Sequence, residues 1–165
     1  MVKADWTIYE EDYWAINSVL KELIENSNSQ SVILIDKTGQ LIASVGLEPE
    51  FDLMSFASLC AADFEANAQL AMLIGERDFS TLYHQGSDES MYLSRVAQAI
   101  ILVVLFNKRT TLGLVRLRVK KAVEGLNTIL NGLFEKLEYE NEDLKEFDET
   151  FAEELNREID SLFQD

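Results

Sequence analysis

The stretch Ile100–Ala122, IILVVLFNKRTTLGLVRLRVKKA, decides which fold this sequence predicts. Its near-continuous apolar run up to Phe106 is typical of a strand that is buried on both faces. A basic turn over Asn107–Arg109 follows, and then two threonines, Thr110 and Thr111, either of which can cap a helix. Apolar residues then recur three and four positions apart, at Leu112, Val115, Val119, Ala122, Val123, Leu126, Ile129, Leu130, Leu133, Phe134 and Leu137. The sequence therefore predicts a central strand that leads into a long amphipathic helix.

The remaining elements are indicated by hydrophobic periodicity and by turn residues. An N-terminal helix is predicted to end at Asn26–Ser29, and Asp36–Gly39 has the composition of a hairpin turn. The predicted strands are Ser31–Ile35, Leu41–Val45, Phe79–His84, Ser90–Val96 and Ala99–Phe106, and a second helix is predicted over Leu53–Ile74. The order α-β-β-α-β-β-β-α indicates an α/β (α+β) fold in which helices pack on a five-stranded, mostly antiparallel sheet.

The second predicted helix is apolar on two sides. One side carries Leu53, Phe56, Cys60, Phe64, Ala71 and Ile74, and the rest carries Ala57, Leu59, Ala61, Ala62, Ala66, Leu70 and Leu73. A helix of this kind must bury both sides, and one of them can pack on the sheet of its own chain. Because small residues let a second backbone come close, we predict that the other side forms an oligomer interface. Complete burial of the helix within one subunit is the alternative.

The C-terminal residues differ in composition from the rest of the chain. Of the net charge of −16, most lies in residues 135–165, which hold thirteen acidic and three basic residues. We expect a domain over residues 1–138 and an acidic tail over 139–165, in which Tyr139–Glu149 is a flexible tether. Phe151, Leu155, Ile159 and Leu162 then recur at helical spacing, which is typical of a short amphipathic helix that docks on a partner. A frayed extension without a function is the alternative.

A basic patch lies inside the predicted domain. It consists of Lys108, Arg109, Arg116, Arg118, Lys120 and Lys121, with no acidic residue between them. Such a patch is commonly the solvated face of a helix. The alternative is a contact site for an acidic partner or for the acidic tail of the chain itself.

Several classes of function lack support in the sequence. Strong overall acidity argues against a nucleic-acid partner. No apolar run is long enough to cross a bilayer and no signal sequence is evident, so we expect a cytoplasmic protein without membrane insertion. The lone Cys60 fits a reducing compartment. His84 has no companion ligand and no phosphate-binding loop is present, so we expect no metal, no cofactor and no enzymatic activity of its own.

Three segments resemble a known family. They are Val32–Ile42 (VILIDKTGQLI), Leu70–Glu76 (LAMLIGE) and Phe106–Leu117 (FNKRTTLGLVRL), and the C-terminal Ile159–Phe163 is similar more loosely. Together with the element order, they resemble the roadblock superfamily and, within it, the bacterial MglB family of polarity regulators. The resemblance implies a homodimer in which the second helices pack together and the sheets join edge to edge. It also implies binding of one MglA-like Ras-family GTPase per dimer, with stimulation of GTP hydrolysis and a role in cell polarity or gliding motility.

The resemblance also implies site residues. A GTPase interface is expected at Ala61, Ala62, Glu65, Ala68, Gln69 and Met72, and a dimer interface at Ala57, Cys60, Phe64, Ala66 and Tyr83. The family supplies no arginine finger, and its tail docks on the GTPase. In the family the middle of the second helix is rich in Ala, Gly and Asn, whereas this chain has Asp63, Phe64, Glu65 and Gln69. Either the GTPase has adapted, or the protein is a roadblock scaffold that binds other polarity or signalling proteins. A ligand-binding sensor domain is a third, weaker alternative.

Overall fold

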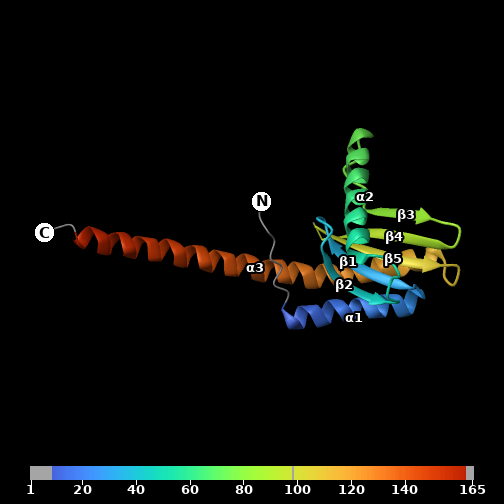
Figure 1. Cartoon of the computed structure of the whole chain (residues 1–165), viewed down its shortest axis with the longest axis horizontal. Helices are drawn as coiled ribbons and strands as arrows, with labels where there is room; N and C mark the ends of the chain where they lie inside the picture. Colours follow the sequence, from blue (N-terminus) through green and yellow to red (C-terminus); the bar gives the residue numbers. More distant parts are fainter. Residues whose placement is uncertain (1–8, 98, 163–165) are drawn as a thin grey trace. The chain divides into compact units, whose positions relative to one another are not determined.

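The computed structural model describes residues 9–97 and 99–162, and its elements follow the predicted order (Figure 1). They are α1 (Glu10–Ser27), β1 (Ser31–Asp36), β2 (Leu41–Gly46), α2 (Leu53–Leu73), β3 (Thr81–Gln85), β4 (Glu89–Val96), β5 (Ile100–Asn107) and α3 (Leu112–Leu162). Strand ends differ from the predicted ones by at most two residues, which is the usual uncertainty of such boundaries.

The five strands form one sheet in the order β2-β1-β5-β4-β3. Every neighbouring pair is antiparallel, so the predicted α/β fold with a five-stranded antiparallel sheet is confirmed. Strand β5 is central: Val104 lies opposite Val32 of β1 on one side and opposite Tyr92 of β4 on the other. Its residues are almost all buried, as the apolar run predicted.

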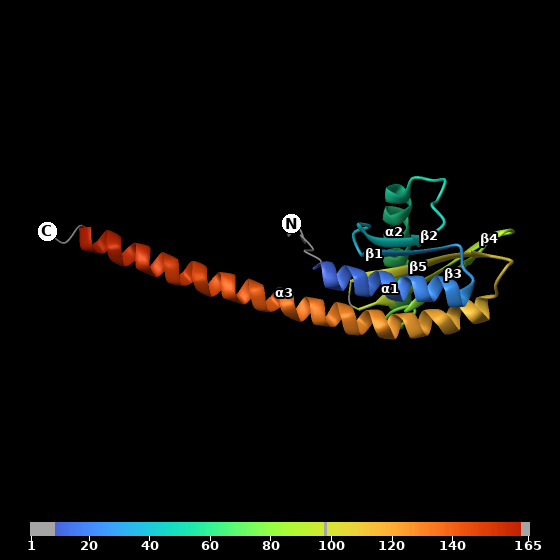
Figure 2. The same ribbon diagram turned by 90° about the horizontal axis from the view of Figure 1, so that it is seen from below.

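Helices cover both faces of the sheet (Figure 2). Helix α2 packs on one face, where Ile33, Ile101 and Val103 form a core with its buried side chains. Helix α1 and the first part of α3 lie on the other face, and Leu20 of α1 and Leu126 of α3 are fully buried. Because side chains alternate along a strand, the even-numbered residues of β5 face α1 and α3, and the odd-numbered ones face α2.

Two polar turns position the helices against the sheet. The Asp36 carboxylate accepts hydrogen bonds from the backbone nitrogens of Thr38 and Gln40, at 2.8 and 2.9 Å, which closes the predicted hairpin turn. Gly39 has φ +88°, and a Cβ there would lie 2.6 Å from the Ser58 Cα, so this turn packs directly on the α2 backbone. A side chain at position 39 would push α2 away from the sheet.

The basic turn between β5 and α3 is closed in a similar way. Thr111, one of the two candidate caps, accepts a hydrogen bond at its side-chain oxygen from the Leu114 nitrogen. The Asn28 amide at the end of α1 donates to the Arg109 carbonyl oxygen at 3.0 Å. The turn therefore fixes the end of α1 to the start of α3.

The described residues fall into two compact units, which meet at Leu130 and Asn131. The first contains α1, the sheet, α2 and the beginning of α3, and the second contains the remainder of α3. The predicted flexible tether over Tyr139–Glu149 is wrong, because this segment is helical. It is rich in Glu and also contains Leu and Lys, all good helix formers, and it has neither Gly nor Pro. The division into a domain over 1–138 and a tail over 139–165 remains a prediction.

Candidate functional site

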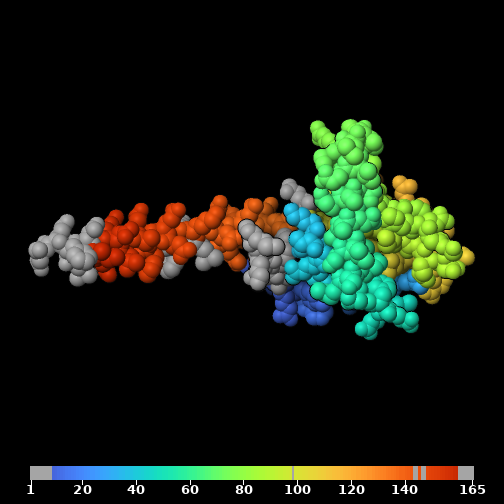
Figure 3. All heavy atoms as spheres, turned by 45° about the horizontal axis from the view of Figure 1, so that its top comes forward, coloured from blue at the N-terminus to red at the C-terminus, as the bar shows by residue number. Residues whose placement is uncertain are grey.

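The outer side of α2 is an exposed apolar surface on an element that packs on the sheet. It carries Leu59, Ala62, Ala66, Leu70 and Leu73, all of them exposed. Leu59 and Leu73 retain 70% and 82% of their accessible surface. The spacing of three and four residues aligns these side chains in one seam, which is typical of a helix that packs against a second helix. Figure 3 shows α2, in teal to green, with this side open to solvent.

The opposite side of α2 packs on the sheet of its own chain. Ala57, Cys60 and Phe64 are almost completely buried there, and so is Ala61. Their assignment to the dimer interface and, for Ala61, to the GTPase interface is therefore corrected. Periodicity identifies an apolar helix side but does not say whether the sheet of the same chain or a partner covers it.

Phe64 also differs from the expectation that it adds bulk to the exposed surface. Its ring lies in the core, and the Arg95 guanidinium carbon lies 5.4 Å from the ring centroid. Arg95 also forms an ion pair with Asp78. Phe64 and Arg95 thus join α2 to β4 inside the protein, and neither residue alters the exposed surface of α2.

The other residues predicted to contact a GTPase lie on the exposed flank of α2. Ala62, Glu65, Gln69 and Met72 are exposed, and Ala68 is half-buried. The Gln69 side chain donates a hydrogen bond to the Glu65 carboxylate at 2.9 Å, which holds the two long side chains together along the helix. This flank therefore combines one polar pair, Glu65 and Gln69, with the apolar Ala68 and Met72, and Ala62 lies where the flank borders the seam.

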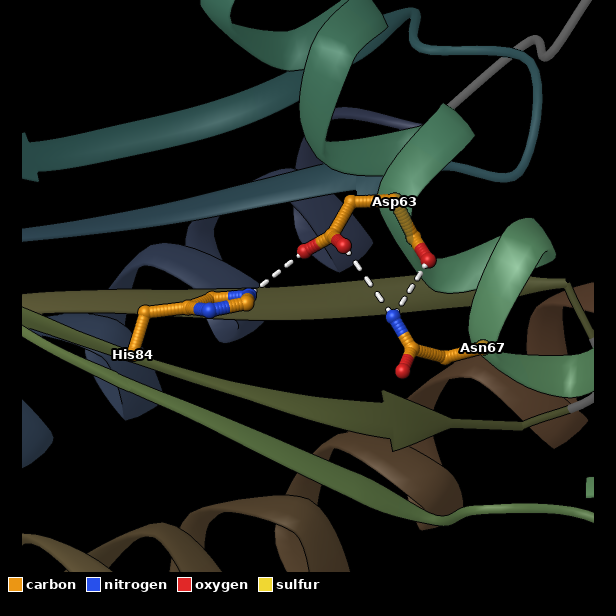
Figure 4. Close-up of polar contacts among 3 residues, drawn as sticks. All are labelled: Asp63, Asn67 and His84. Carbon is orange, nitrogen blue, oxygen red and sulfur yellow. Dashed lines mark hydrogen bonds and ion pairs between the residues drawn. The ribbon is translucent and has the colours of Figure 1, made fainter. Parts of the chain in front are cut away.

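A polar cluster connects the middle of α2 to β3 (Figure 4). His84 Nε2 lies 2.6 Å from Asp63 Oδ2, and Asn67 Nδ2 donates to the Asp63 carboxylate at 3.0 Å and to its backbone oxygen at 2.8 Å. The Asp63 side chain is thereby directed toward the sheet. Sequence reasoning missed this pair because its members are 21 residues apart in the chain and only the fold brings them together.

Strand β3 lies at the edge of the sheet, and its only strand neighbour among the described residues is β4. Four of its five residues are exposed, so one row of its backbone groups is available to another strand. Tyr83, predicted to lie in a dimer interface, is 37% exposed, and its ring stacks on Phe106 with 6.1 Å between the ring centroids. The structure thus places the outer seam of α2 and an unpaired sheet edge in the same unit.

The predicted tail-docking residues lie on the second unit. Phe151, Leu155 and Ile159 are helical and exposed, so the apolar stripe of this segment is uncovered. Leu162 closes the helix, and its side chain lies outside the described residues. Among the described residues, no group of acidic, histidine and cysteine side chains is arranged to hold a metal ion, and no helix is long and apolar enough to cross a membrane.

The profile of the Roadblock/LC7 domain matches residues 15–106, which run from α1 to the end of β5. The chain belongs to the Roadblock/LC7 family. Among solved structures, MglB of Myxococcus xanthus is similar to it with 44% identity and a TM-score of 0.73, over 77% of this chain and 96% of that one. The gliding protein MglB of Thermus thermophilus follows with 30% identity and a TM-score of 0.72, over 78% and 97% of the two chains. No curated protein matches the chain.

A more distant Roadblock/LC7 domain, from Streptomyces avermitilis, shares the fold alone, with 15% identity and a TM-score of 0.63 over 68% of this chain and 95% of that one. The resemblance to the MglB proteins inferred from the hairpin and from the strand–turn–helix stretch is confirmed. This Roadblock/LC7 chain is thus MglB-like over nearly the whole length of its MglB relatives. Its outer α2 seam, its β3 edge and the Asp63–His84 pair are the features from which a function must be argued.

Proposed function

We propose that the protein is a homodimeric regulator that binds an MglA-like Ras-family GTPase and stimulates its GTP hydrolysis. The observation that carries this proposal is the apolar outer seam of α2, which the chain leaves uncovered. The 44% identity to Myxococcus MglB supports it. The protein acts in the cytoplasm as a non-enzymatic partner, in the control of cell polarity or gliding motility.

The dimer forms through the outer side of α2. Leu59, Leu70 and Leu73 supply apolar area, and Ala62 and Ala66 between them let a second α2 approach closely. The exposed β3 edge lies beside this helix and pairs with the same strand of the second copy. This dimer buries the apolar seam and also gives hydrogen-bond partners to the unpaired backbone groups of β3.

The GTPase contacts the flank of α2 at Glu65, Ala68, Gln69 and Met72, and it reaches Ala62 at the border between this flank and the dimer seam. The Asp63–His84 pair fixes this part of α2 against the sheet, so that the flank is presented as a rigid surface. The protein then stabilises a conformation in which the residues of the GTPase itself are placed for attack on the γ-phosphate, which is catalysis by positioning. The stripe of Phe151, Leu155, Ile159 and Leu162 provides an additional contact for the GTPase.

One observation favours a second candidate, a roadblock scaffold that binds other polarity proteins. Glu65 and Gln69 are exposed and hydrogen-bonded to each other on the flank that the GTPase must approach. Bulky side chains on a flat helix surface obstruct close packing. A GTPase without compensating changes would therefore be excluded from this flank.

The two candidates are distinguished by the double substitution Glu65→Ala with Gln69→Ala. Complex formation is measured by size exclusion with light scattering, using the MglA-like GTPase of the same genome loaded with a non-hydrolysable GTP analogue. For an adapted activator, the unsubstituted protein binds and the double substitution changes the affinity less than about tenfold. For a scaffold, the unsubstituted protein does not bind. The matched control is Lys21→Ala with Glu25→Ala on α1, which also removes an exposed pair four residues apart.

A further inference from the structure

A groove on the sheet face opposite α2 has no role in the proposed GTPase contact. It has a volume of about 740 Å³ and lies between the start of α3 and strands β3 and β4. Tyr92, Leu117 and Val123 give it an apolar lining, and Arg116 and Lys120 are basic side chains of its wall. We refer to this cavity as the α3 groove.

Two of the basic residues that line the groove are unpaired in the described part of the chain. In the rest of the basic patch, Lys121 Nζ lies 2.7 Å from a Glu22 oxygen, and Lys108 Nζ lies 3.5 Å from an Asp88 oxygen. No ion pair occurs at Arg116 or Lys120 within residues 9–97 and 99–162, although both are exposed. Arg116 and Lys120 are four positions apart in the sequence, so they lie on one side of α3. The groove therefore combines an apolar lining with two available positive charges.

The second unit of the same protein carries the complementary chemistry. Phe151, Leu155 and Ile159 form an exposed apolar stripe, one helical turn apart from each other. Glu154 and Glu158 lie on the flank of that stripe with the same spacing of four residues as Arg116 and Lys120. An amphipathic helix commonly binds by placing its apolar stripe in a groove while its charges meet the opposite charges of the rim.

We propose that the α3 groove binds the acidic C-terminal part of α3 from a second copy of the protein. The apolar stripe contacts Tyr92 and Leu117, and Glu154 and Glu158 pair with Arg116 and Lys120. A second copy is the occupant because every copy carries both the basic groove and the acidic, apolar stripe, so that two copies offer complementary surfaces to each other. Contact within one chain is the other outcome that the experiment below distinguishes.

Cross-linking between copies tests this inference. One full-length chain carries Leu117→Cys, and another, enlarged by a tag, carries Leu155→Cys. Cys60 stays in place because burial raises the pKa of its thiol to about 11, which leaves it almost unreactive. Under mild oxidation we expect a disulfide-linked species that contains both chains. Replacing Leu155→Cys by Arg157→Cys, on the side of the helix opposite the stripe, reduces the yield at least tenfold.

Charge reversal shows whether the proposed ion pairs form this contact. Arg116→Glu with Lys120→Glu in the groove lowers the cross-linking yield at least tenfold, and Glu154→Lys with Glu158→Lys in the partner restores it. Lys21→Glu with Lys37→Glu, two exposed positions outside the groove, leaves it unchanged. Far-ultraviolet circular dichroism confirms that each variant is folded. A third chain carries both Leu117→Cys and Leu155→Cys. The inference is overturned if charge reversal leaves the cross-linking yield unchanged, or if a disulfide forms only within this third chain and not between copies.

The contact has a consequence for the proposed function, although it does not depend on it. The stripe that enters the groove is the one proposed to contact the GTPase, so the two contacts exclude each other. The cross-linking is measured without any GTPase. A failure of the groove contact and a failure of GTPase activation are therefore separate results.

Discussion

Asp63 on α2 and His84 on β3 are joined by a 2.6 Å contact between a carboxylate oxygen and a ring nitrogen. Both side chains are partly exposed, so the pair contributes little to stability, about 0.2–1 kcal/mol. Its position gives it a different importance, because it connects the middle of α2 to the open edge of the sheet. The proposed dimer uses both of these elements, and the proposed GTPase contact uses the flank of α2.

His84→Ala is expected to leave the protein folded and to weaken GTPase binding by about two- to fivefold, because the middle of α2 loses its attachment to β3. Chemical denaturation measures the stability, and titration of the labelled GTPase measures the affinity. Gln85→Ala, at the next position of the same strand, is the matched control and should change neither quantity. Equal effects of the two substitutions would show that the contact between Asp63 and His84 has no positioning role.

Leu70→Glu with Leu73→Glu is expected to convert the dimer into a folded monomer. Burial of a leucine side chain contributes about 1.5–3 kcal/mol, so losing two should weaken the dimer at least about a hundredfold. Analytical ultracentrifugation over a range of concentrations measures the dissociation constant of the dimer. Met54→Glu, at an exposed position near the start of α2 and away from the seam, should leave the dimer intact. Persistence of the dimer after the double substitution would place the interface elsewhere.

Cys60 is expected to resist a disulfide-exchange reagent at pH 8 until the protein unfolds. The thiol is buried, and this burial raises its pKa to about 11, so hardly any thiolate is present at that pH. Reaction in buffer should be at least a hundredfold slower than in denaturant. No disulfide between copies should form through Cys60, since this residue packs on its own sheet. Rapid reaction in buffer would show that Cys60 lies on the outer surface of α2.

Arg77→Ala, Arg95→Ala and Arg109→Ala are each expected to lower the stimulated hydrolysis rate less than tenfold once the GTPase is saturated. An arginine finger contributes about 10³–10⁵ in rate, so its loss is easily recognised. Arg95 already has a structural role beside Asp78 and Phe64. A loss of several hundredfold with intact binding at any of the three positions would identify an arginine finger.

Removal of residues 139–165 is expected to leave a folded dimer. Leu133 is the last buried side chain among those of α3 that the structure describes, and the outer seam and the β3 edge lie in the first unit. The melting temperature should change by less than a few degrees, and light scattering should still give twice the monomer mass. Dissociation of the truncated protein would assign the C-terminal part of α3 to the dimer interface.

The fold was predictable because its signals are local. The apolar run Ile100–Phe106 is typical of a buried strand, and the stripe after it is typical of a helix, so β5 and the start of α3 were predicted from local pattern alone. The tail shows the limit of the same reasoning. Acidity and the loss of apolar periodicity suggested a tether at Tyr139–Glu149, although the intrinsic helix propensity of these residues is high.

The site was less predictable because it depends on contacts between distant segments. The sequence showed that α2 has two apolar sides, but it did not show which of them faces the sheet. This decides whether Phe64 or Leu70 is available to a partner, and in the structure it is Leu70. The link between Asp63 and His84 required the strand order, which no local pattern contains. The unpaired edge of β3 likewise follows from the order β2-β1-β5-β4-β3.

GTP hydrolysis by the MglA-like GTPase of the same genome, under single-turnover conditions and with increasing amounts of this protein, tests the central proposal most directly. The proposal predicts a stimulated rate that saturates at two copies of the protein per GTPase. An unchanged rate at every concentration, in the presence of an intact dimer, would contradict activation and would favour the scaffold.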